Sequence, residues 1–104
     1  MWILRTEDSD EARALTFRIL AGAIKTIGRA TRADFIVDRT LVSRLHCRLT
    51  ATPSGQLEVE DLNSTNGTLV NGRRVLKRTP LSDGDRLRVG RVELVATKSG
   101  RKGG

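Results

Sequence analysis

The sequence has few of the residues on which several protein classes depend. It contains one cysteine, Cys47, and one histidine, His46, so a single chain can form neither an internal disulfide nor a four-ligand zinc site. The longest apolar run, residues 19–24, is far shorter than the roughly 20 residues that a membrane-spanning helix needs. These absences argue against a secreted disulfide scaffold, a zinc finger and a membrane protein.

The composition that remains is that of one folded domain. A chain of 104 residues is long enough for a single hydrophobic core and too short for a second one. Hydrophobic residues make up 38% and charged residues 30%, with no low-complexity tract, so we expect a folded chain rather than a disordered one. No cofactor is expected from these residues.

Positive charge is concentrated in the last third of the chain. Residues 1–70 contain nine basic and nine acidic residues, whereas residues 71–104 contain ten basic and three acidic ones and carry the whole formal charge of +7. This imbalance favours an anionic partner, which can be a nucleic acid, a phosphoprotein or a membrane surface. A solvated basic flank without any partner explains the charge equally well.

Short alternating segments separated by turn residues indicate an all-β fold. Asn-Gly and Asp-Gly pairs, which supply the positive φ angles of tight turns, occur at residues 66–67, 71–72 and 83–84. A period of two with one apolar face is typical of half-buried antiparallel strands, and many short strands favour a β-sandwich or small barrel. The strands expected are residues 2–5, 15–20, 23–27, 47–51, 57–60, 86–89 and 92–97.

Two segments are expected to lie outside the strands. Residues 6–14 read as an acidic loop, although residues 11–15 can form a helical turn that Asp10 would cap. Residues 98–104 contain no apolar side chain and read as a disordered basic, glycine-rich tail.

The common motifs of enzyme active sites are missing. The sequence has no phosphate-binding P-loop, no Gly-x-Ser-x-Gly elbow and no Gly-x-Gly-x-x-Gly fingerprint. Ser43 and His46 are three residues apart, which on a strand would place them on opposite faces, so they do not form a nucleophile–base pair. Cys47 belongs to an apolar strand face and is expected in the core. We expect that this protein is not an enzyme.

Polar residues instead gather in three separate loops. Gly28-Arg29 follows a strand, Ser43-Arg44-x-His46 precedes one, and Asn63 to Thr68 forms a third polar segment. Guanidinium groups can bind a phosphate in bidentate fashion, and hydroxyl and amide donors can complete a cage around it. The residues therefore predict an oxyanion site on loops, but they do not show that the loops meet.

This order of motifs resembles the forkhead-associated (FHA) domain. The matching residues are Gly28-Arg29, Ser43-Arg44-x-His46, Asn66-Gly67-Thr68 and Asn71-Gly72, followed by Asp83-Gly84-Asp85. The resemblance covers residues 1–97. It implies a β-sandwich of about eleven strands with the binding loops at one end, and an activity of binding phosphothreonine in short segments of partner proteins.

The resemblance also implies a role for each matching residue. Arg29 corresponds to the arginine that contacts the phosphate, Ser43 to the serine whose hydroxyl holds it, and Arg44 to a position that often reaches it. The other implied roles are phosphate binding by Thr65, peptide binding by Asn66 and Leu41, and structural support of the site by Gly28, His46, Gly67 and Asn71.

A narrower resemblance links the sequence to the N-terminal FHA domains of nibrin-like DNA-repair proteins. It rests on the opening Met1-Trp2, the position of Arg29 near the start, and the string Val42-Ser43-Arg44-Leu45-His46. It implies a role in DNA-damage signalling or repair and a nuclear location. The chain departs from that family because the tandem BRCT repeats are not part of it.

Two alternatives stay open beside phosphothreonine binding. The chain can be an FHA-fold scaffold that does not read phosphate, or it can bind nucleic acid weakly through its basic last third. Against nucleic acid, the three aromatic residues, Trp2, Phe17 and Phe35, do not interleave with the basic run, so a stacking platform is missing. We therefore expect at most weak, non-specific nucleic-acid binding and no membrane contact.

Overall fold

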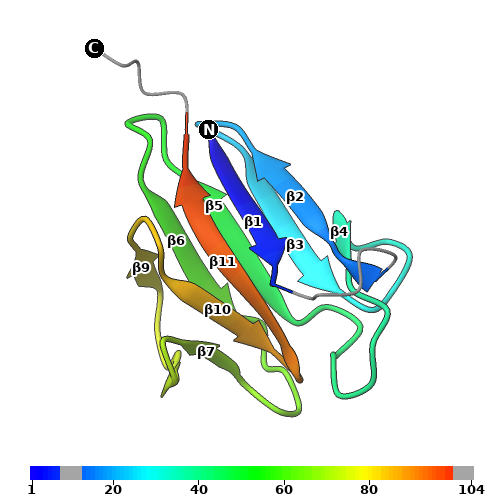
Figure 1. Ribbon diagram of the computed structural model, residues 1–104. Helices are drawn as coiled ribbons and strands as arrows, with labels where there is room; N and C mark the ends of the chain where they lie inside the picture. The colour runs from blue at the N-terminus through cyan, green and yellow to red at the C-terminus, as the bar shows by residue number, and fades with distance from the viewer. Residues whose placement is uncertain (8–12, 100–104) are drawn as a thin grey trace.

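The computed structural model describes residues 1–7 and 13–99 and confirms the all-β sandwich. Eleven strands form two sheets, which Figure 1 shows as two layers, with β1, β10 and β11 in one and β3, β5 and β6 in the other. One sheet has six strands in the order β2 (Thr16–Ile19), β1 (Trp2–Thr6), β11 (Val92–Lys98), β10 (Arg86–Val89), β7 (Thr68–Val70) and β8 (Arg73–Arg74). The other has five in the order β4 (Phe35–Ile36), β3 (Ile24–Gly28), β5 (Cys47–Ala51), β6 (Leu57–Asp61) and β9 (Thr79–Leu81).

Strands with a clear period of two lie where the alternation predicts them. All seven expected strands are present, with ends displaced by no more than one residue. The four strands that the pattern does not locate are β4, β7, β8 and β9, which have only two or three residues each. So short a segment cannot display an alternation, and its pairing is set by neighbouring strands instead.

The tail expected over residues 98–104 is wrong at its first residue, because Lys98 belongs to the folded domain. Lys98 is the last residue of β11, and its backbone N–H donates to the Asp83 carboxylate at 2.8 Å. Its ammonium lies 5.9 Å from the Trp2 ring centroid, so contacts that sequence reading cannot see hold this lysine in the fold. Residues 100–104, and Asp10 with most of the expected acidic loop and helical turn, lie outside the described residues.

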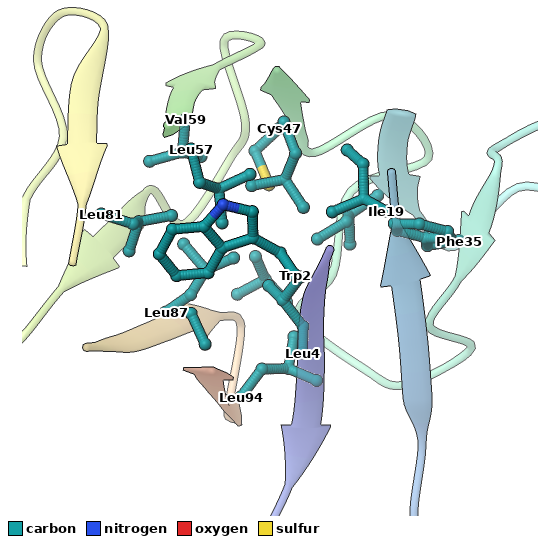
Figure 2. Packing of buried hydrophobic residues seen from close by; sticks show 14 of the residues in the cluster. Trp2, Leu4, Ile19, Phe35, Cys47, Leu57, Val59, Leu81, Leu87 and Leu94 are labelled. Atoms are coloured by element: carbon teal, nitrogen blue, oxygen red, sulfur yellow. The ribbon is translucent and has the colours of Figure 1, made fainter. Parts of the chain in front are cut away.

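The core lies between the sheets and is built from the inward residues of both. Figure 2 shows the Trp2 indole among Leu57, Leu81 and Leu87, which come from both layers. The indole Nε1–H donates to the Gly55 carbonyl at 2.9 Å, so its one polar group is satisfied. The large ring therefore joins the two sheets at one end of the sandwich.

Cys47 is a core residue, as its strand position predicts. Its side chain is fully buried, and this burial raises the pKa of the thiol far above its ordinary value. The sulfur therefore stays a neutral thiol, which is a poor nucleophile.

The two ends of the described chain lie side by side, at the same end of the sandwich (Figure 1). The Met1 ammonium donates to the Ser99 carbonyl at 3.2 Å, and the Ser99 N–H donates to the Met1 carbonyl at 2.8 Å. No helix in the described ranges has the length and apolar character that crossing a membrane requires.

Truncation of a core leucine should cost far more stability than the same change on the surface. Leu87 is completely buried on β10, whereas Leu76 is 86% exposed. We expect Leu87→Ala to lower the free energy of unfolding by about 2–5 kcal/mol because it leaves a cavity, and Leu76→Ala to change it by less than about 0.5 kcal/mol. Urea denaturation of both variants measures the difference, and equal losses would contradict this description of the core.

Candidate functional site

A short backbone ladder ties the end of β3 to the loop before β5. The Arg29 N–H donates to the Ser43 carbonyl at 2.9 Å, and the Ala30 N–H donates to the Arg44 carbonyl at 3.1 Å. This approach is so close that a Cβ on Gly28 would lie 1.9 Å from the Arg44 carbonyl oxygen. Only glycine fits there, and its absence of a side chain allows Arg29 to lie beside Ser43.

His46 joins this loop to the loop before β7. Its ring is fully buried, its Nδ1 accepts a hydrogen bond from the Ser43 backbone N–H at 3.0 Å, and its Nε2 lies 2.9 Å from the Gly67 carbonyl oxygen. Because Nδ1 accepts, the ring proton belongs on Nε2, which donates to Gly67. Both ring nitrogens therefore serve as connections between loops.

The expectation that Ser43 and His46 lie on opposite faces of a strand is wrong. Both precede β5, and the bend between them folds the imidazole back onto the Ser43 amide. Ser43 and His46 still do not form a nucleophile–base pair, but for another reason. The Ser43 hydroxyl oxygen accepts a hydrogen bond from the Thr65 N–H at 3.0 Å and is not bonded to the imidazole ring.

Asp61 organises the third loop, a role that the sequence analysis missed. Its carboxylate accepts hydrogen bonds from the Ser64 and Thr68 hydroxyls and from the Ser64 N–H, while the Ser64 hydroxyl accepts from the Gly67 N–H at 2.9 Å. Partial burial of the carboxyl acts to raise its pKa, but these hydrogen bonds outweigh it, and the pKa of Asp61 is lowered. The spacing Asp61-x-x-Ser64, a short polar turn, is the signal that could have found it.

The three loops surround one open cavity of about 650 Å³. Arg29, Ser43 and Thr65 all line it. The Arg29 Nε–H donates to the Val42 carbonyl at 3.0 Å, which holds the guanidinium group at the cavity and leaves its two terminal NH₂ groups outside this hydrogen bond. The Ser43 hydroxyl oxygen accepts from Thr65 and keeps its own proton to donate. The complete lining is Arg29, Asp38, Arg39, Thr40, Leu41, Val42, Ser43, Thr65 and Asn66.

Leu41 and Asn66 form the wall of the cavity together. The Asn66 Nδ2–H donates to the Leu41 carbonyl at 3.0 Å, and the Leu41 backbone has a φ of 72°, which is rare for a leucine. The β10–β11 turn supports this conformation, because a Cβ on Gly90 would lie 2.9 Å from the Leu41 carbonyl carbon. The Leu41 side chain stays 44% exposed at the cavity edge.

Besides the supporting residues Gly28, His46 and Gly67, two further residues named by the resemblance, Arg44 and Asn71, do not line the cavity. Arg44 is exposed, and its described contact is the one through its backbone carbonyl. Asn71 lies at the other end of β7, where its Nδ2–H donates to Asp85 at 3.0 Å and its Oδ1 accepts from the Arg86 N–H at 2.9 Å. Asn71 therefore supports a turn that is one strand length away from the cavity.

Arg39 is a second cation of the cavity and was missed by sequence reasoning. It lines the cavity together with Asp38 and Thr40 because the loop before Leu41 curls over the site. The only signal is a polar triplet next to the motif, which is too common to be specific. The described residues contain no cluster of three His, Cys, Asp or Glu side chains able to hold a metal ion.

These loops and this cavity, on an eleven-strand sandwich, define an FHA domain. Residues 25–90 match the FHA-domain family model, and the chain belongs to that family. FHA domains are regulatory binding modules, and relatives include the glycogen accumulation regulator GarA of Mycobacterium tuberculosis and an oxoglutarate dehydrogenase inhibitor of Corynebacterium diphtheriae. The expectation that this chain is not an enzyme is confirmed.

Among curated relatives, the ABC transporter ATP-binding/permease protein Rv1747 of Mycobacterium tuberculosis is 43% identical over 81 residues, which are 78% of this chain and 9% of the relative. FhaA of the same organism is 38% identical over 87 residues, which are 83% of this chain and 16% of FhaA. This chain thus matches a small part of both. A solved FHA domain, from an analysis of phosphothreonine-dependent FHA domain interactions, has a TM-score of 0.83 and 32% identity, covering 96% of this chain and 98% of that one.

These relatives correct the expected location. They come from Mycobacterium and Corynebacterium, and a further structure of this fold comes from Chlamydia trachomatis. Bacteria have no nucleus, so the nuclear location is wrong. It followed from the narrower resemblance to nibrin-like proteins, which none of these comparisons supports.

Replacement of Asp61 by asparagine should change stability in a pH-dependent way. The variant loses charge-assisted hydrogen bonds, so we expect it to be about 2 kcal/mol less stable at neutral pH. Because the pKa of Asp61 is lowered in the folded state, its contribution is complete above the ordinary value of 3.8 and is lost as the pH falls through the folded pKa. Urea midpoints of Asp61→Asn and the unchanged protein should therefore converge at low pH, and a gap that stays constant down to pH 3 would refute this role.

Proposed function

We propose that this domain binds a phosphothreonine-containing segment of a partner protein in the cavity between its three loops. The observation that carries the proposal is the meeting of the Arg29 guanidinium and the Ser43 hydroxyl at one open cavity, which Thr65 and Asn66 line from a separate loop. Hydrogen bonds through His46 hold these loops together before any ligand is present. Such preorganisation lowers the entropy cost of binding.

The free donors of the cavity suit a phosphate dianion. A phosphothreonine carries about −1.5 to −2 charge and three acceptor oxygens at neutral pH. The terminal NH₂ groups of Arg29 can bind two of these oxygens, and Ser43 can donate to the third. Charge-assisted hydrogen bonds contribute roughly 1.5–3 kcal/mol each. Two or three of them contribute about 3–9 kcal/mol before the cost of ordering a peptide, so micromolar affinity, about −8 kcal/mol, also requires the peptide contacts on either side of the phosphate.

Other residues would hold the peptide on either side of the phosphate. The Asn66 amide oxygen can accept from a peptide N–H while its Nδ2 stays bound to Leu41. The exposed Leu41 side chain offers an apolar contact for a residue that follows the phosphothreonine. Arg44 would add long-range attraction, and Gly28, Gly67 and His46 would act through the loop geometry already described, whereas Asn71 would support the turn at the far end of β7.

Preference for threonine over serine requires a slot for the γ-methyl group. Burial of one methyl contributes only about 0.8 kcal/mol, or about fourfold in affinity. Stronger discrimination would need steric or conformational help from the loop residues around Ser43 and Thr65.

Similar domains have been solved in complex with a protein domain and with a phosphopeptide. A solved structure shows the FhaA FHA domain in complex with the intracellular domain of Rv3910, and another shows Mycobacterium tuberculosis EmbR with a low-affinity phosphopeptide. The identities of these chains to ours are 33% and 26%. We therefore place the proposed phosphothreonine reading in bacterial regulation, and the role in DNA-damage signalling or repair is not part of the proposal.

Loss of the Arg29 guanidinium should weaken phosphopeptide binding without unfolding the domain. We expect Arg29→Ala to reduce affinity for a degenerate phosphothreonine peptide library by at least about 10- to 150-fold, because the loss of even one of its two charge-assisted hydrogen bonds has that effect. Arg32→Ala is the matched control, since Arg32 is also exposed in the loop after β3 but does not line the cavity. Titration calorimetry measures both, and circular dichroism checks that the fold is kept.

The same titration separates the alternatives. Phosphoserine and unphosphorylated libraries, each at two salt concentrations, should bind more weakly than the phosphothreonine library. Equal binding of all three libraries, or an Arg29→Ala variant that binds like the parent, would refute the proposal and leave an FHA scaffold. Binding to duplex DNA that vanishes with salt would identify only a non-specific basic surface.

A further inference from the structure

The outer face of the six-stranded sheet combines arginines with aliphatic side chains, and it lies apart from the cavity. We propose that this face docks a partner protein whose own surface surrounds apolar side chains with carboxylates. We call it the arginine face, and it uses no residue that lines the cavity. Its members are Arg5, Arg18, Arg74, Arg86 and Arg88 together with Ile3, Leu69 and Val95.

Strand alternation places all of these residues on one side. Leu4, Leu87 and Leu94 point inward and are completely buried, so their neighbours along β1, β10 and β11 point outward. The five arginines are exposed, and the three aliphatic residues are half-buried. Adjacent strands are about 4.8 Å apart, so the face extends about 24 Å from β2 to β8.

The register gives each aliphatic side chain an arginine neighbour. Val95 is opposite Arg5 on one side and Arg86 on the other. Likewise, Leu69 is opposite Arg88 on β10 and Arg74 on β8.

Ile3 on β1 completes the pattern. It is opposite Arg18 on one side and Thr97 on the other. The apolar patches are thus framed by cations, which is a repeated arrangement rather than a scatter of charges.

The two faces of the sandwich differ in charge balance. On the five-stranded sheet, Arg48 and Arg78 pair with Glu58 and Glu60 at 2.9–3.6 Å, so that face neutralises itself. On the arginine face, Arg86 pairs with two glutamates, Glu93 on β11 and Glu7 just after β1. Five arginines against two glutamates, both of which pair with Arg86, leave a positive surface that an acidic partner would complement.

The mixture of side chains favours a protein over a nucleic acid. All five cations are arginines and none is a lysine, which is the bias of protein–protein interfaces. No aromatic side chain points outward among the described residues of this sheet to stack on a base. A nucleic acid would contact the arginines and leave Ile3, Leu69 and Val95 uncovered, whereas a protein can cover both. Because Arg5 and Arg18 belong to β1 and β2, the positive surface is not confined to the last third of the chain.

Synthetic peptides of defined pattern test the proposal on the chain of 104 residues. The probe is a twelve-residue peptide that alternates glutamate and valine, compared with an all-glutamate peptide, a lysine–valine peptide and a short DNA duplex. Nuclear magnetic resonance should show amide shifts along β1, β10 and β11 with the glutamate–valine peptide, and an affinity at least about threefold above that of the all-glutamate peptide. The proposal would be overturned if no shifts appeared or if the shifts were confined to the cavity loops. It would also be overturned if the all-glutamate peptide and the DNA duplex bound as tightly as the glutamate–valine peptide.

Charge reversal provides the matched control. Arg18→Glu lies on the arginine face, whereas Lys77→Glu makes the same charge change in the exposed loop between β8 and β9. We expect Arg18→Glu to weaken glutamate–valine binding about fivefold or more, and Lys77→Glu by less than about twofold. Equal effects of the two variants would show a general charge effect and reject the arginine face. Phosphopeptide affinity should be the same in both variants, so this result is independent of the proposed function.

Discussion

The buried imidazole of His46 is the contact on which the geometry of the cavity depends. One ring nitrogen holds the Ser43 amide and the other holds the Gly67 carbonyl, so two loops from different parts of the chain share one rigid link. The Asp61 carboxylate then fixes the far loop from behind through Ser64 and Thr68. A ligand that enters the cavity meets side chains that are already oriented, and no buried side-chain N or O atom in the described part of these loops lacks a hydrogen-bond partner.

Much of the fold could be predicted because the long strands carry their own signal. Leu87 and Val89 alternate with Arg86 and Arg88. Because one face must be buried, this alternation predicts a strand whose leucine and valine point inward. The short strands β4 and β8 have no such signal. They form because β3 and β7 present open edges to them, which is a property of the assembled sheets and not of residues 35–36 or 73–74.

Most residues of the site could be predicted from the sequence, but the contacts that bring their loops together could not. The motif residues Arg29, Ser43, Thr65 and Asn66 line one cavity, although the sequence alone could not bring their loops together. Arg39 and Asp61 were missed because their roles arise from where a loop curls and where a carboxylate is left among hydroxyls. Arg44 was assigned to phosphate binding by its position in a motif, yet it does not line the cavity, and Asn71, assigned to structural support, holds a turn at the far end of β7.

The charge of the chain has a different meaning in three dimensions than along the sequence. Counting by position makes the first two thirds neutral, but Arg5 and Arg18 join Arg86 and Arg88 on the same sheet face. Two of the nine acidic residues that balance this segment, Glu58 and Glu60, lie on the opposite sheet and form ion pairs there. Although residues 1–70 are neutral in sum, the folded domain therefore has one sheet face with balanced charge and one sheet face with positive charge.

The hydrogen bonds between Met1 and Ser99 bring the ends of the described fold to one point, at the end of the sandwich away from the cavity loops. A polypeptide can enter and leave the domain there without crossing the loops (Figure 1). The fold is consequently suited to transplantation as a cassette. Spliced into a surface turn of a host protein, it would need no long linkers and would present its loops outward from the host.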